Sequence, residues 1–107
     1  MNKACRKGLA AKISDTFMQT NFLLGEIKMT AKVRETLGRI PFDLVARHAV
    51  NDHGIITVRE ARGNKLSMQT MGAPIISRYR VNPTDPLTKF VRVETSARWV
   101  DTLISIE

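Results

Sequence analysis

Residues 54–71, GIITVREARGNKLSMQTM, contain the local pattern that most strongly predicts a fold for this chain. A run of β-branched and apolar residues precedes the tripeptide at 62–64 (RGN), which is typical of a turn, and a second run of similar length follows it. With a three-residue loop, Val58 lies opposite Met68, and most apolar side chains share one face. Register follows the face that is buried. We therefore expect a half-buried β-hairpin whose outer face carries Arg59 and Lys65, with Arg62 at its tip.

The charge balance is the outstanding feature of the composition. The chain has 107 residues, of which 43% are hydrophobic and 25% charged, as in an average folded protein. Seventeen Lys and Arg residues face ten Asp and Glu residues, which gives a net charge of +7. Such an excess favours polyanionic partners. We expect one small basic α+β domain over residues 1–107. Residues 1–28 are expected to form an N-terminal extension, because the sequence from Met29 resembles the beginning of a protein.

Cysteine usage and hydropathy indicate the compartment. Cys5 is the only cysteine, so an internal disulfide is excluded and a reducing compartment is expected. No apolar run approaches the roughly 18 residues of a membrane span. The sequence therefore predicts a cytoplasmic protein with no membrane association.

Helices are expected before the hairpin and strands after it. Apolar periodicity predicts helices over 3–24, 30–38 and 42–50. The last has the cleanest apolar stripe: Phe42, Val45, Ala46, Ala49 and Val50. Its other side then exposes Asp43, Arg47, His48 and Asn51. Alternation predicts strands over 75–81, 90–95 and, from its β-branched residues, 98–106. The fold class is α+β, with N-terminal helices followed by an antiparallel β-meander.

Three helices followed at once by a hairpin, with a short glycine-containing turn before the third helix, resemble a winged helix-turn-helix protein over about residues 5–71. The resemblance makes 42–51 a recognition helix in the major groove and 59–65 a wing on the DNA backbone or minor groove. The nucleic-acid-binding residues that it implies are Arg47, His48, Asn51, Arg59, Arg62 and Lys65. Asp43 departs from this pattern, because a carboxylate near the start of a recognition helix repels phosphates. An ordinary α+β domain, with the hairpin packed on its helices, is the alternative.

A second basic group is expected on one face of the sheet. Alternation places Arg78, Arg80 and Arg92 around Phe90, with Arg78 facing Phe90 across two strands. Basic side chains beside an aromatic ring suit stacked bases and phosphates. They suit an acidic protein surface equally well, and a solvated face with one cation–π contact is also consistent with them.

Signals for catalysis are weak. His48 and His53 lie five residues apart, with no cysteine pair or acidic cluster to complete a metal site and no glycine-rich phosphate loop. We therefore expect no enzyme activity, no cofactor and no metal.

The leading hypothesis is a non-enzymatic protein that binds duplex DNA, of the winged-helix regulator type. One alternative is a protein-interaction module that modulates an acidic partner, as small accessory proteins of mobile elements do; another is a sheet-based RNA binder. The sequence is also compatible with a homodimer.

Overall fold

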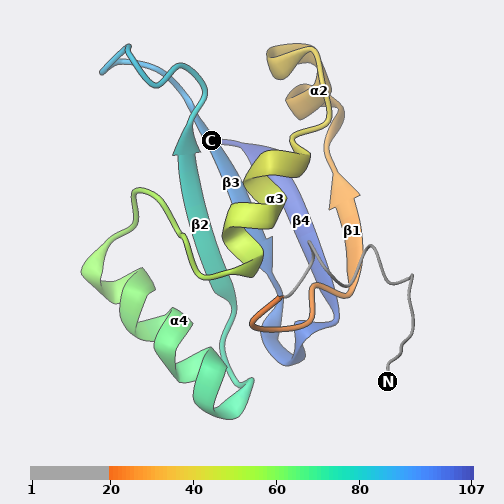
Figure 1. Cartoon of the computed structure of the whole chain (residues 1–107), viewed down its shortest axis with the longest axis vertical. Helices are drawn as coiled ribbons and strands as arrows, with labels where there is room; N and C mark the ends of the chain where they lie inside the picture. Colours follow the sequence, from red (N-terminus) through yellow and green to blue (C-terminus); the bar gives the residue numbers. More distant parts are fainter. Residues whose placement is uncertain (1–19) are drawn as a thin grey trace, which may run out of the picture.

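A mixed four-stranded sheet forms the centre of the protein in the computed structural model, which describes residues 20–107 (Figure 1). The strands are β1 (Glu26–Met29), β2 (Ile75–Arg80), β3 (Phe90–Thr95) and β4 (Asp101–Ile106), in the spatial order β1-β4-β3-β2. Strands β2, β3 and β4 are antiparallel neighbours, and β1 joins the edge of β4 in parallel. The α+β class is therefore confirmed, whereas the strand order is not a simple meander.

Three α-helices are described within these residues: α2 (Ala31–Leu37), α3 (Phe42–Ala49) and α4 (Val58–Thr70). Helix α3 crosses one face of the sheet, and α4 stands apart from the other helices, beside the β2 edge (Figure 1). A single 3₁₀ turn, η1 (Ala97–Trp99), connects β3 to β4. None of the helices from residue 20 onward is long and apolar enough to cross a membrane.

The hydrophobic core lies between the inner sheet face and helices α2 and α3. Residues of β2 and β3 alternate between buried and partly exposed, so each strand turns every second side chain inward. Burial of apolar surface on this face is the main stabilising contribution. The core cluster consists of Val33, Leu44, Val45, Tyr79, Val91, Val93 and Ile104.

The predicted hairpin over residues 54–71 is wrong, because its larger part forms helix α4. Thr57 and Glu60 make a capping box: Glu60 N donates to Thr57 Oγ1 at 3.0 Å, and Thr57 N donates to Glu60 Oε1 at 2.9 Å. The expected turn at 62–64 continues as helix, and a Cβ at Gly63 would meet nothing within 4 Å. Without this hairpin the predicted wing is missing, and the winged-helix arrangement is not confirmed.

Other expectations fare differently. Helices close to 30–38 and 42–50 and strands at 75–81, 90–95 and 98–106 are confirmed within a few residues. The register of β2 against β3 is shifted by two residues, since Arg78 lies opposite Arg92 rather than Phe90. The helix predicted over 3–24 lies outside the described residues, except for residues 20–24, which are not helical. Strand β1 was not predicted, although residues 26–28 of the expected extension pair with β4.

Candidate functional site

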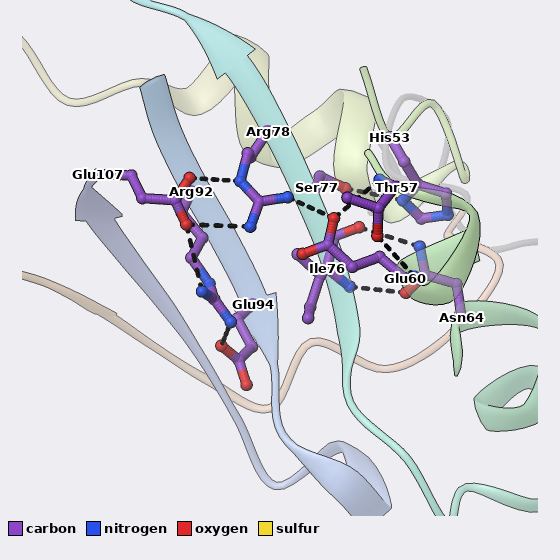
Figure 2. Close-up of polar contacts among 10 residues, drawn as sticks. All are labelled: His53, Thr57, Glu60, Asn64, Ile76, Ser77, Arg78, Arg92, Glu94 and Glu107. Atoms are coloured by element: carbon purple, nitrogen blue, oxygen red, sulfur yellow. Dashed lines mark hydrogen bonds and ion pairs between the residues drawn. The ribbon is translucent and has the colours of Figure 1, made fainter. Parts of the chain in front are cut away.

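Helix α4 is bound to the sheet by polar side chains rather than by an apolar stripe. Asn64 Nδ2 donates to the carbonyl oxygen of Ile76 at 2.9 Å, and Ile76 N donates to Asn64 Oδ1 at 2.8 Å (Figure 2). One side-chain amide thereby takes the place of a neighbouring strand on the exposed edge of β2. One turn later, Trp99 Nε1 donates to Ser67 Oγ at 2.9 Å. These contacts fix which side of α4 faces the protein.

The opposite side of α4 is a basic stripe, by which we mean Arg59, Arg62 and Lys65. The three residues follow one another at intervals of three, so they share one side of the helix, and all three are exposed. None of them has an ion-pair partner among residues 20–107. Glu60, the acidic residue of this helix, points inward and binds Arg78. The outward side of α4 is therefore positively charged without a compensating carboxylate on the helix.

Two basic residues, Arg39 before α3 and Arg47 within it, differ from this stripe because carboxylates already bind them. Arg47 Nε donates to Asp52 at 2.7 Å, and its guanidinium carbon lies 4.6 Å from the centre of the Tyr79 ring. Arg39 donates to Asp43 at 2.6 Å. Arg39, Asp43 and Arg47 line a cavity of about 360 Å³ between α3 and β2. Arg80 lines it as well and has no ion-pair partner among residues 20–107, so one uncompensated positive charge borders this cavity.

The outer sheet face proposed as an alternative surface is a balanced ionic network (Figure 2). Arg78 bonds with Glu60 on α4 and with Glu107, while Arg92 donates to Glu94 at 2.6 Å and to Glu107 at 3.3 Å. The hydrogen bond from Arg78 lowers the pKa of Glu60 to about 2. The positive charges of Arg78 and Arg92 are thus compensated by neighbouring carboxylates.

The remaining two members of that surface lie at its end. The register puts Arg80 opposite Phe90 and on the same face as Arg78 and Arg92, as the alternation predicted. Arg80 is exposed and Phe90 is partly buried. The four residues do share a face. Of its three arginines, only Arg80 lacks an ion-pair partner among residues 20–107.

His48 is completely buried, so its expected place on the exposed side of α3 is wrong. The buried side of α3 consists of Leu44, Val45, His48 and Ala49, whereas Phe42 and Val50 of the predicted stripe are exposed. The imidazole is held inside because hydroxyl groups of the sheet bind both its nitrogens. Burial of its polar atoms is therefore compensated by hydrogen bonds.

A chain of hydrogen bonds runs through this interior from Leu24 to His53, and its proton positions follow from the acceptors at its start. Thr102 Oγ1 donates its single proton to the carbonyl oxygen of Leu24 at 2.6 Å. Thr95 Oγ1, 2.7 Å from Thr102 Oγ1, must then be the donor of that pair. Because the proton of Thr95 is used, His48 Nε2, at 2.8 Å, donates to Thr95 Oγ1.

The tautomer of His53 follows from the same chain. Burial lowers the pKa of His48 to about 3, so its imidazole is neutral and its Nδ1 accepts from Ser77 Oγ at 2.6 Å. Since the proton of Ser77 is used there, His53 Nδ1, at 2.7 Å, must donate to Ser77 Oγ. Burial also lowers the pKa of His53, which is therefore neutral with its proton on Nδ1. Its Nε2 is an acceptor without a hydrogen-bond partner among residues 20–107.

His53 lines a groove of about 290 Å³ between α4 and the chain that leaves α3. Asn51, which lies two residues beyond the end of α3 and has a φ of 65°, borders the same groove. Lys65 of the basic stripe borders it too. The structure thus places Asn51, Arg59, Arg62 and Lys65 around α4, with Arg47 engaged on α3 and His48 inside the protein.

Sequence reasoning missed Asn64 and Ser77, and it considered His53 only as a metal ligand. The signal for α4 was present, because Thr57 followed three residues later by Glu60 is a capping-box pattern. Helical spacing of Glu60, Asn64 and Ser67 would have indicated one inward side. Neither pattern indicates the contact between Ser77 and two histidines, which depends on residues 24 or more positions apart.

No protein-family model, no curated protein and no solved structure matches this chain.

Proposed function

We propose that this protein binds duplex DNA without enzymatic activity and that the basic stripe on α4 makes the contact. The observation that carries the proposal is the difference between paired and unpaired basic side chains. Arg39, Arg47, Arg78 and Arg92 are bound by carboxylates. Several other basic residues have no such partner among residues 20–107, but only Arg59, Arg62 and Lys65 form a set of three on one side of a single helix within that range. Basic groups left uncompensated on one surface attract phosphates.

The dimensions of α4 support this assignment. Its 13 residues span about 20 Å, and Arg59 and Lys65 lie about 9 Å apart along the helix axis. A helix fits the major groove of B-DNA, which is about 12 Å wide. The helix also stands at the edge of the fold, clear of α2 and α3 (Figure 1). It can therefore approach a duplex without moving the core.

The roles proposed for α3 change accordingly. Arg47 is held by Asp52 and stacks on Tyr79, and His48 has no exposed surface, so neither is assigned to DNA in this proposal. DNA binding in the manner of a winged-helix protein is not part of the proposal either, because residues 59–65 are helical and form no wing. Asn51 stays a candidate because it is exposed and borders the groove beside α4.

Binding of an acidic protein or RNA to the outer sheet face has less support. Contact there would have to compete with Glu60, Glu94 and Glu107 for Arg78 and Arg92. Breaking such pairs removes attractions that are already present, so little net affinity is expected.

The salt dependence of DNA binding, measured by fluorescence anisotropy, tests the proposal. Each phosphate contact contributes about −0.9 to the slope of log K against log salt, so replacing Arg59, Arg62 and Lys65 by alanine should make the slope less steep by about 2.7. The matched control replaces three other exposed basic residues without ion-pair partners among residues 20–107: Lys32, Arg34 and Lys89. The control loses the same charge and should change the slope by less than one unit. Equal changes in both triple variants, or no binding by the parent at low salt, would overturn the proposal.

A further inference from the structure

The groove beside α4 has the composition of a ligand site rather than of a packing defect. Its apolar walls come from Ile56, Ala61 and Met68, and its polar border from Asn51, His53 and Lys65. At about 290 Å³ it is at the lower end of ligand pockets, so it fits one ring system rather than a whole cofactor. Asn64 also lines it, but the Asn64 amide is occupied by the backbone of Ile76.

The hydrogen-bond chain gives the groove a defined chemical preference. His53 uses its Nδ1 proton on Ser77, which leaves Nε2 as a pure acceptor. The chain from Leu24 through Thr102, Thr95, His48 and Ser77 allows no other arrangement of protons while His48 is neutral. The complementary group on an occupant is an N–H donor.

The charge at the border points to an anionic occupant. Lys65 belongs both to the groove and to the basic stripe, and it has no ion-pair partner among residues 20–107. Arg62 lies one turn away on the same side of α4. No carboxylate is among the residues that line the groove. A flat heterocycle with an N–H edge and an attached anion satisfies all three features.

We propose that the groove binds one unstacked nucleotide of the DNA strand that contacts α4, with the base between Ile56 and Met68. The N–H edge of the base donates to His53 Nε2, and the adjoining phosphate contacts Lys65. This inference rests on the proposed DNA binding and adds to it a preference for a strand with an unpaired base. Such a base has lost its stacking and pairing before binding, so entering the groove costs less than extruding a paired one.

Two DNA duplexes of the same sequence, one with a single bulged 2-aminopurine, test this inference. The parent protein should bind the bulged duplex about tenfold more tightly, in the range that stacking of one base provides. The fluorescence of 2-aminopurine should change as its environment changes. Ala61→Phe fills the groove from α4 and should bring the ratio of the affinities for the bulged and the paired duplex down to about one. Ala31→Phe, at an exposed position of α2, is the matched control and should keep the preference.

A second measurement does not need duplex binding. Titration with deoxyadenosine monophosphate should shift the Met68 methyl and His53 ring signals in NMR spectra, whereas deoxyribose 5-phosphate should not. Failure of both the bulge preference and these shifts, or a preference that survives Ala61→Phe, overturns the groove assignment. If the preference for the bulged duplex is lost in Ala61→Phe but is unaffected by replacing the basic stripe, the proposed duplex contact of α4 is wrong and the groove assignment stands.

Discussion

Gly63→Ala tests whether residues 58–70 form a helix or a hairpin, because the two structures predict opposite effects on stability. Gly63 lies in the middle of α4, where glycine is less favourable than alanine by roughly 0.5–1 kcal/mol. A Cβ at this position meets nothing within 4 Å, so no steric cost reduces the gain. The free energy of unfolding should therefore rise by about 0.5–1 kcal/mol. For a domain of this size, the corresponding rise in Tm is about 2–8 °C.

Thermal and urea unfolding monitored by circular dichroism measure the change, and Gly54→Ala is the control of opposite sign. Gly54 has a φ of +69°, and its Cβ would lie 2.1 Å from the carbonyl oxygen of Arg78. The left-handed conformation alone costs roughly 1–2 kcal/mol, and the clash adds to it. If Gly63→Ala lowers stability by about 1 kcal/mol or more, as expected for a glycine required in a turn, the helical assignment is refuted.

Two further predictions concern the polar contacts. Asn64→Ala should destabilise the protein by about 2 kcal/mol, because the N–H and C=O of Ile76 both lose their partner; urea unfolding measures this, and a change under about 0.5 kcal/mol would contradict the edge contact. Acidification should destabilise the protein from about pH 6.5 downward, because burial lowers the pKa of His48 to about 3 in the folded state, so the unfolded state binds more protons. The loss between pH 6.5 and 5 should be about 1.6 kcal/mol, and equal stability at both pH values would contradict a buried neutral His48.

Regular alternation explains why the sheet could be predicted and α4 could not. Strands β2 and β3 bury every second side chain in an apolar core, so their sequences show the expected period of two. Helix α4 packs with Glu60, Asn64 and Ser67 against a strand edge, where backbone groups need polar partners. Its inward side is therefore polar, and apolar periodicity gives no signal. The β-branched residues at 55–58 then favoured a strand, although the Thr57 cap starts a helix there.

The candidate site was predicted in part. The basic character of Arg59, Arg62 and Lys65 was predicted, but the residues lie on one side of a helix instead of on the outer face of a hairpin with Arg62 at its tip. His48 was misplaced because Leu44 and His48, rather than Phe42 and Val50, complete the inward side of α3. A histidine on an amphipathic helix gives no sequence signal of burial when its partners are distant hydroxyl groups such as Ser77 and Thr95. Strand β1 is short and partly exposed, so its four residues carry little pattern.

The most direct measurement of DNA contact by α4 is an NMR titration of the whole ¹⁵N-labelled chain with an unlabelled duplex at low salt. Amide signals of residues 58–70 should shift most, and they should return toward their free positions as salt is raised, because the contact is mainly electrostatic. Signals of the outer sheet face around Arg78 and Arg92 should change little. Shifts concentrated on that face, or no shifts at any residue, would contradict duplex binding by α4.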